Sequence, residues 1–471
     1  MATSYLNRTL GTVSSTTVQT LSVWIKPLEN AHHSGNIGVG EGYGALVTGQ
    51  YDSGSGGAGY WHGGGASTEF SRLSFWSNNG SGNAETEPYV QVEDSSAWTH
   101  IVYSVNLGAS GNDKLKIYVN GELMTEYVAD ERSNYTTLSN WWDTGKTIQI
   151  GRKFTDADSL YFHGNMAQLH LCDGYNYAAS DFGETDSTTG IWKPKINPSV
   201  NYGNEGFFLK FSNSSDLGED FSGNNNDFTN SSVISTVDNP KNNFATLFCD
   251  HRMIDTDADS VTDTILVPTL SNAGLSALNP NGSLGSAAVS SYGMNAGKWY
   301  MEIKAGANMS NQARYGVSIH ERDAHDAFYM STVTGYWYDA DGTLVTGPGN
   351  TTASYGNSFT TNDIIQIAYD ADNGTLWFGK NGTWQNSATQ SEIEAGTTTN
   401  AAVSGLSTSD TWHFSFLDLN NGEYHVNFGN GYFGTTAVSS GVTDDSTLGT
   451  FEYTPPSGFY SLCSKNINTY G

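Results

Sequence analysis

The sequence has few of the residues on which several common protein classes depend. Among 471 residues only three are cysteine, Cys172, Cys249 and Cys463, and no C-x-x-C pair is present. An odd, widely spaced set predicts neither a disulfide framework nor a zinc knuckle, so we expect assembly in a reducing compartment. No apolar run approaches the ~20 residues of a membrane-spanning helix, and the first residues lack the basic and apolar regions of a signal peptide. We therefore expect a soluble protein that is not exported by classical secretion.

Positive charge is also scarce. The chain has 20 Lys and Arg against 48 Asp and Glu, a net charge of −28, although charged residues make up only 14% of it. Nucleic-acid binding requires clustered Lys and Arg, so a nucleic-acid partner is not expected. The excess of carboxylates favours solubility, tolerance of salt or cation binding, and a solvated acidic surface is the simplest interpretation.

What the sequence does contain is a strong β signal, clearest in residues 363–385, DIIQIAYDADNGTLWFGKNGTWQ. Ile365, Ile367 and Tyr369 alternate on one face of a strand, and the Asp-Asn-Gly that follows suits a tight hairpin turn. Both faces of the hairpin are apolar, which predicts strands buried between layers. With 54 glycines and 13% aromatic residues, we predict an all-β fold of two β-sandwich (jelly-roll-like) domains in tandem.

The length favours two domains. The polar segment TVDNPKNN (236–243) marks the boundary, which places the domains at residues 1–238 and 239–471.

The first domain contains five segments whose order and spacing resemble those of laminin-G-like domains of the concanavalin A type. They are SVWIKP (22–27), AWTHIVYSVN (97–106), KIYVNGE (116–122), IQIGR (148–152) and FHGNMAQLHL (162–171). The resemblance covers about residues 1–172 and implies a two-sheet jelly roll. The later segment 206–229, with GFFLKF and DFSGNNNDFT, is similar to the strand and turn that usually open such domains. We hypothesise a circular permutation in which this segment completes the first sandwich.

The second domain resembles a SPRY domain over about residues 285–433. The segments that carry this resemblance are GKWYMEIK (297–304), YGVSI (315–319), the 363–382 hairpin and VNFGNG (426–431). It implies a bent β-sandwich whose loops bind partners, with a role in recognition and not in catalysis.

The whole arrangement, with FGETDSTTGIWKPK (182–195) between the domains' main segments and a closing YTPPSGFYSLCSKN (453–466), resembles virion proteins of tailed bacteriophages, especially marine ones. The resemblance implies a protein assembled in the host cytoplasm that acts on the virion surface. It also implies other virion proteins as partners and a homo-oligomer.

Motifs for catalysis are missing. Jelly-roll glycanases carry paired carboxylates at alternate positions of a strand, yet Glu302 is alone in YMEIK and Glu122 follows a turn. The sequence contains no G-x-S-x-G, H-E-x-x-H or P-loop motif. We therefore do not expect an enzyme.

Two aromatic groups are candidate ligand-binding residues, because aromatic faces stack on sugar rings. Tyr60, Trp61 and His62 lie within a glycine-rich stretch, and Trp141 and Trp142 lie between turn-forming residues. The alternative is that these side chains pack at a sandwich edge or against a neighbouring subunit.

An acidic run supplies the candidate metal ligands Asp255, Asp257, Asp259 and Asp263. Calcium is the cation that such oxygen ligands would bind, but Ser260 and Leu266 stand where an EF-hand needs Gly and Glu. A solvated loop is the simpler interpretation, and no other cofactor is expected. A weaker metal signal comes from His320, Asp323 and His325.

These observations favour a non-catalytic virion-associated recognition or adhesion protein, such as a tail fibre, spike or head-surface fibre. It would bind a host surface glycan or another virion protein, without membrane insertion. A purely structural capsid or tail decoration protein is one alternative, and a polysaccharide depolymerase is the other.

Overall fold

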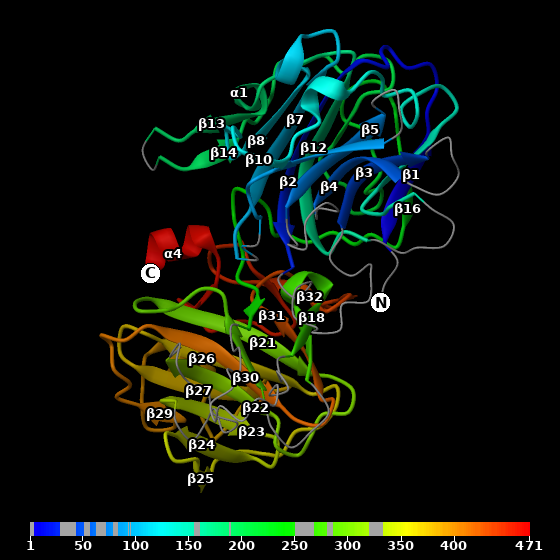
Figure 1. Cartoon of the computed structure of the whole chain (residues 1–471). Coiled ribbons are helices and arrows are strands. Elements are labelled where there is room, and N and C mark those ends of the chain that lie inside the picture. The colour runs from blue at the N-terminus through cyan, green and yellow to red at the C-terminus, as the bar shows by residue number, and fades with distance from the viewer. Residues whose placement is uncertain are drawn as a thin grey trace, which may run out of the picture. The chain divides into compact units, whose positions relative to one another are not determined.

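The computed structural model is mostly β-structure and divides into two compact units, Met1–Ser235 and Thr236–Gly471 (Figure 1). It describes residues 4–28, 44–50, 57–62, 72–78, 83–92, 94, 96–154, 161–187, 190–249, 268–279, 286–319 and 333–471. The division after Ser235 lies close to the expected boundary after residue 238. Each unit contains large antiparallel sheets, which confirms the prediction of an all-β chain with two sandwich domains.

In the described part of the chain, helices are few and short. The α-helices are α1 (Ala179–Phe182), α3 (Gln390–Glu394) and α4 (Ser464–Tyr470), and the 3-10 helices are η2 (Gly111–Lys114), η3 (Arg132–Asn134) and η4 (Asn272–Gly274). None of the described helices has the length and hydropathy to cross a membrane.

Unit 1 is built on two main sheets. The first has eight strands in the order β10 (Tyr127–Ala129), β6 (Asn83–Pro88), β5 (Leu73–Asn78), β4 (Gly57–His62), β3 (Gly44–Gln50), β11 (Thr147–Ile150), β1 (Tyr5–Thr9) and β16 (Thr229–Ser231). The second has six in the order β15 (Phe207–Leu209), β12 (Gly164–Asp173), β2 (Val18–Pro27), β7 (Thr99–Asn106), β8 (Leu115–Val119) and β9 (Glu122–Leu123). A separate hairpin is formed by β13 (Gly183–Thr185) and β14 (Trp192–Pro194).

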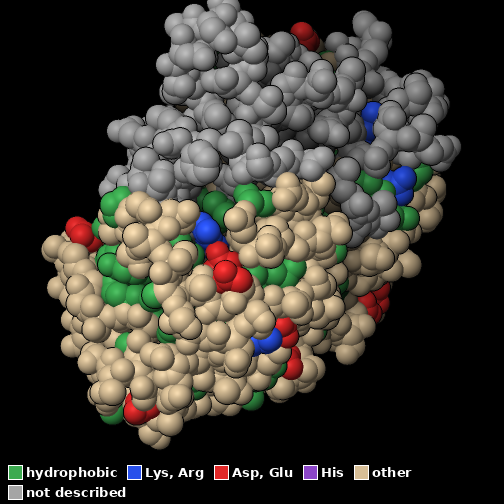
Figure 2. Space-filling model, turned by 90° about the horizontal axis from the view of Figure 1, so that it is seen from below, with side chains coloured by type: hydrophobic (Ala, Val, Ile, Leu, Met, Phe, Trp, Pro, Cys, Tyr) green, Lys and Arg blue, Asp and Glu red, His purple; other side chains and the backbone are tan. Residues whose placement is uncertain are grey.

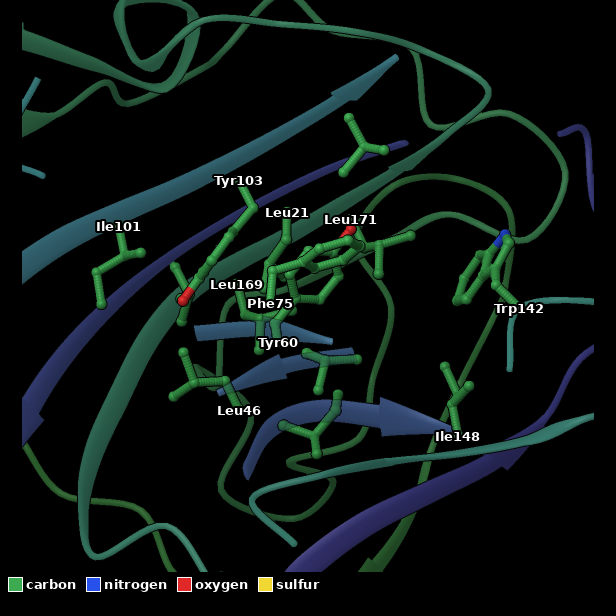
Figure 3. Close-up of a cluster of buried hydrophobic side chains, with 14 of the residues drawn as sticks. Leu21, Leu46, Tyr60, Phe75, Ile101, Tyr103, Trp142, Ile148, Leu169 and Leu171 are labelled. Atoms are coloured by element: carbon green, nitrogen blue, oxygen red, sulfur yellow. The ribbon is translucent and has the colours of Figure 1, made fainter. Parts of the chain in front are cut away.

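The main core of unit 1 lies between these sheets (Figure 3). Along β2, Leu21, Val23 and Ile25 are fully buried in this core, because alternate side chains of a strand share a face. The segment after β12 also joins the sandwich: β15 pairs with β12 in the register Leu169↔Leu209, and β16 pairs with β1. This is the pairing that the circular-permutation hypothesis requires.

Unit 2 has a seven-stranded and a nine-stranded sheet. The seven strands run in the order β17 (Leu247–Phe248), β20 (Ser286–Ser290), β30 (Trp412–Asp418), β22 (Arg314–Ile319), β23 (Gly335–Asp339), β24 (Thr343–Gly347) and β25 (Thr351–Ser354). The nine-stranded sheet has the order β18 (Thr269–Ser271), β19 (Ser276–Leu278), β31 (Glu423–Asn427), β21 (Lys298–Ala305), β26 (Ile364–Asp370), β27 (Thr375–Lys380) and β28 (Thr383–Trp384), with β29 (Val403–Ser404) on β27 and β36 (Tyr460–Ser461) on β21. Two small hairpins are β32 (Tyr432–Phe433) with β33 (Thr436–Ala437), and β34 (Val442–Thr443) with β35 (Thr450–Phe451).

The hairpin of β26 and β27 confirms the strongest sequence prediction. All of β26 and most of β27 is buried, and the two strands pair from Asp370↔Thr375 onward. At the turn Gly374 has φ of 60°, and a Cβ there would stand 2.1 Å from the Leu406 carbonyl oxygen. Only glycine fits, since this position combines a left-handed backbone with a close approach of another segment.

Both units carry a second apolar layer on the outer face of one sheet. In unit 1, residues of the segment 174–204 pack on Val102 and Cys172 of the six-stranded sheet. In unit 2, Ile393, Phe451 and Phe459 pack on outward-facing side chains of the nine-stranded sheet such as Trp377. The strands beneath these layers are therefore apolar on both faces.

Candidate functional site

The first predicted aromatic group does not lie in a loop. Tyr60 and Trp61 belong to β4, and their exposed fractions are 0% and 5%. The Tyr60 hydroxyl donates to Gln19 Oε1 at 2.6 Å inside the core, and its ring lies among the core side chains in Figure 3. His62 Nε2–H donates to the Val92 carbonyl oxygen at 2.8 Å. The Tyr60 ring fills the sandwich interior and cannot form the predicted stacking platform. Trp61 lies on the opposite face of β4, with its ring 6.3 Å from that of Trp76, and His62 is half-buried. For these two residues ligand binding stays a prediction.

The second aromatic group is also interior. Trp141 and Trp142 are 0% exposed. Trp141 packs edge-on against Tyr60, with ring centroids 5.6 Å apart, and Trp142 Nε1–H donates to Asp173 Oδ1 at 3.2 Å. These side chains stabilise the core and cannot stack on a sugar, so this prediction is wrong as well.

The predicted metal ligands are not among the residues that the structure describes. Asp255, Asp257, Asp259 and Asp263 lie outside the described residues, as do His320, Asp323 and His325. Within the described part of the chain, no group of three or more His, Cys, Asp or Glu side chains is placed to hold a metal ion.

A serine–histidine pair lies under the outer layer of unit 1, and sequence analysis did not single it out. His100 is 0% exposed, and its ring stacks on Trp24 with centroids 4.8 Å apart. Trp192 of β14 donates its Nε1–H to His100 Nδ1 at 2.9 Å. Because Nδ1 accepts this bond, the proton of the neutral ring is on Nε2, which donates to Ser22 Oγ at 2.8 Å.

That tautomer is the wrong one for catalysis. A general base must accept the hydroxyl proton of its nucleophile, whereas His100 donates to Ser22 and has no free acceptor nitrogen. Burial lowers the pKa of His100 to about 3, since a desolvated imidazolium is disfavoured. The pair therefore works as a structural hydrogen-bond chain that connects the sheet to β14.

The second buried histidine of this face has a similar role. His170 Nδ1 lies 2.8 Å from the Tyr202 hydroxyl, and its ring stacks on Phe208 at a centroid distance of 3.8 Å. Burial, together with the nearby His100, lowers its pKa. Its contacts connect β12, β15 and the segment 174–204.

The one carboxylate singled out in a strand, Glu302, is also occupied. It is 0% exposed in β21 and accepts hydrogen bonds from the backbone N–H of Glu452 at 2.8 Å and of Tyr453 at 2.7 Å. Burial raises its pKa to about 7, although these bonds act in the opposite direction. The carboxylate fixes the 452–453 segment to the nine-stranded sheet.

Glu302 is the centre of a polar row across three strands. Its cross-strand neighbours are Asn427 on β31 and Gln366 on β26, and all three are nearly or fully buried. Gln366 accepts from the Gly382 N–H at 2.8 Å, and Asn427 accepts from the Gly429 N–H at 2.9 Å. The row positions the turns and loops that cross this face of the sheet.

Comparisons with known proteins agree with this architecture. The family model of the concanavalin A-like lectin/glucanases superfamily matches residues 2–180, and the SPRY domain model matches residues 298–404. The chain carries a concanavalin A-like domain followed by a SPRY domain.

Two solved structures are similar to part of the chain. The crystal structure of the SPRY domain of human HERC1 has 20% sequence identity and a TM-score of 0.27, covering 34% of this chain and 91% of that one. A crystal structure of a human SPRY domain has 12% identity and a TM-score of 0.24, with coverages of 34% and 93%. A search among curated proteins found no match.

The concanavalin A-like domain presents one projecting element, the hairpin of β13 and β14, which extends to the left in Figure 1. Ile191, directly before β14, and Ile196, two residues after it, are 63% and 73% exposed, among the highest values of the described large hydrophobic residues. Between them, Trp192 is half-buried and bonded to His100. We define the described residues 183–187 and 190–196 as the contact hairpin, the candidate functional site.

The base of the contact hairpin is held firmly. The Trp192 ring lies so close to Gly121 and Gly183 that a Cβ at either would approach it to 2.8 and 2.4 Å. Lys193 forms ion pairs with Asp186 at 2.8 Å and Glu184 at 3.8 Å across the hairpin. In the sequence, this segment was used only as part of a family resemblance. The position of its isoleucines between turn-forming residues could have indicated that they are exposed.

Proposed function

We propose that this chain is a non-catalytic recognition protein on the surface of a tailed-bacteriophage particle. It would act as a tail fibre, spike or head-surface fibre, and be assembled in the host cytoplasm. The observation that carries the proposal is the contact hairpin, where exposed isoleucines stand on a rigidly held base. Exposed apolar side chains next to a fixed aromatic residue are typical of protein and ligand contacts.

The hydrogen bonds of the buried polar side chains support a binding function rather than a catalytic one. Ser22 and His100 have hydrogen bonds that leave no base for a nucleophile, and both oxygens of Glu302 accept backbone N–H groups. Retaining glycanases need two accessible carboxylates ~5 Å apart. A polysaccharide depolymerase is therefore the weaker alternative.

Assembly in a reducing compartment is supported by the cysteines. Cys172, Cys249 and Cys463 are buried and are not joined in disulfides, and burial raises the pKa of the Cys172 thiol well above its usual range. A buried thiol of high pKa is chemically inert, so the chain does not depend on oxidation to fold.

The partner of the contact hairpin would be another virion protein or a host surface component. Ile191 and Ile196 supply apolar contact without aromatic stacking, which favours a protein surface over a sugar. That observation also favours the structural alternative, in which the chain decorates a capsid or tail and binds nothing on the host.

A cell-binding experiment separates these functions. Fluorescently labelled full-length protein is added to host cells with calcium or with a chelator, and free phage is the competitor. Saturable, competed binding supports host recognition, and dependence on calcium would assign the Asp255 segment to it. Binding to phage particles that lack the protein, without binding to cells, supports the structural function.

The contact hairpin is tested with matched variants. Ile191→Ser with Ile196→Ser should weaken the observed binding at least about tenfold, which is about 1.4 kcal/mol. The control is Leu123→Ser with Val128→Ser, which changes two other exposed residues of the same domain, 43% and 44% exposed. Equal loss in both double variants would contradict the assignment of the hairpin.

A further inference from the structure

The SPRY domain ends in a free sheet edge. β25 (Thr351–Ser354) is the last strand of the seven-stranded sheet, and among the described strands it pairs only with β24. All four of its residues are exposed. In an antiparallel strand every second residue directs its N–H and C=O away from its partner, so β25 presents unpaired backbone groups to its surroundings.

This edge lacks the usual protection against pairing. Natural proteins guard exposed edges with charged side chains, proline or covering segments. β25 has the sequence TTAS, with no charge and no proline, and threonine favours extended backbone. Two other exposed edge strands are guarded: β9 contains Glu122, and β10 is flanked by Glu126 and Asp130. The short edge strands β16 (TNS) and β18 (TLS) contain no charge either.

The absence of charge extends well beyond the strand. Residues 342–362 contain no Asp, Glu, Lys, Arg or His, in a chain with a net charge of −28. Figure 2 views the molecule from below, the side on which β25 lies in Figure 1, and most of the described surface there is uncharged, with scattered Asp, Glu, Lys and Arg side chains. The edge is thus a neutral region on an acidic protein.

Charge decides which partner suits this edge. Two copies of an acidic chain repel each other where carboxylates come within a Debye length, about 8 Å at physiological salt. A charge-free edge removes that repulsion at the place of contact. Antiparallel pairing of a strand with itself is also symmetric, so the contact closes after two copies.

We propose that β25 pairs antiparallel with β25 of a second copy, which makes one continuous sheet through two SPRY domains. The pairing adds backbone hydrogen bonds on the exposed edge, and the side chains of Thr352 and Ala353 lie near its centre. This interaction surface does not depend on the ligand of the contact hairpin, which belongs to the other domain.

The test is sedimentation velocity of the full-length chain over a range of concentrations. The expected result is a reversible dimer. Thr352→Glu places like charges opposite each other and should raise the dissociation constant at least about tenfold. Thr352→Val keeps shape and strand propensity and should change it less than about twofold, as should the control Thr399→Glu in an exposed turn of the same domain.

A second measurement needs no variant. In the wild-type chain, amide exchange of residues 351–354 should slow as the protein concentration rises, because paired N–H groups exchange slowly. A chain that is monomeric at every concentration would overturn the proposal, as would a dimer that Thr352→Glu leaves unchanged or one without slowed exchange at 351–354.

Discussion

Replacing Trp192 by Phe tests how the contact hairpin is held. The change removes the indole N–H that bonds to His100 Nδ1 at 2.9 Å and keeps an aromatic ring at the site. His100 is fully buried, and its other nitrogen is bonded to Ser22. Whichever tautomer the ring then adopts, one of its two nitrogens is left without a partner.

The expected cost follows from these contacts. A buried polar group without a hydrogen bond costs about 1–3 kcal/mol, and the smaller ring loses about 1 kcal/mol of packing. We therefore expect Trp192→Phe to lower the free energy of unfolding of the concanavalin A-like domain by about 2–4 kcal/mol. The assay is urea unfolding of the full chain, followed by amide exchange of peptides from residues 1–235 so that the two domains are separated.

A double-mutant cycle isolates the hydrogen bond. In a His100→Phe background the acceptor is already gone, so Trp192→Phe should cost about 1–3 kcal/mol less than it does in the wild type. An equal cost in both backgrounds would refute the reasoning, because the bond would then contribute nothing.

Three further predictions concern stability. Burial lowers the pKa of His100 to about 3 and also lowers the pKa of His170. Between about pH 3 and 6.5 the unfolded state therefore binds more protons than the folded state. The histidines therefore contribute their full stabilisation of the first domain above about pH 6.5, and the free energy of unfolding should fall on acidification. For His100 the expected loss at pH 4.5 is about 2–3 kcal/mol. His100→Phe should make the urea midpoint of this domain depend less on pH. Glu302→Gln should destabilise the SPRY domain by about 1–3 kcal/mol, because an amide NH₂ would face a backbone N–H donor; unchanged urea unfolding would contradict this. Arg8 lies 2.7 Å from Glu205, with side chains 14% and 9% exposed, so Arg8→Met should cost about 2–4 kcal/mol and added Glu205→Met should restore most of it.

The sequence was most informative where the signal was local. In β26 and β27 the alternation of side chains and the Asp-Asn-Gly turn lie within one short segment, so the hairpin and its two buried faces could be predicted. The strand 207–209 could be assigned to the first sandwich only because its surroundings resemble a known turn. Its partner, Leu169 to Leu171 of β12, is not visible in the local pattern.

The prediction that Tyr60 and Trp61 lie in a loop is wrong, because it was based on the glycines around them. Their glycine-rich surroundings are typical of a loop, yet the structure uses a glycine to bring two strands together. Gly59 has φ of 139°, and a Cβ there would stand 2.2 Å from the Val47 carbonyl oxygen. The glycine belongs to a close approach inside the sheet, and Tyr60, which follows it, lies in the core.

Long-range contacts account for the other differences. Trp142 bonds to Asp173, and Trp192 bonds to His100 on a strand far away in sequence. Neither local propensity nor spacing contains such pairings. The contact hairpin could therefore not be recognised as a rigid, exposed element before the fold was known.

The most direct test of the proposed function is the binding of labelled full-length protein to host cells, with purified phage as competitor. The account predicts binding that saturates, that free phage abolishes and that Ile191→Ser with Ile196→Ser weakens at least about tenfold, without release of reducing sugars from the cell surface. Sugar release by the protein, or the absence of saturable binding to host cells, would contradict it.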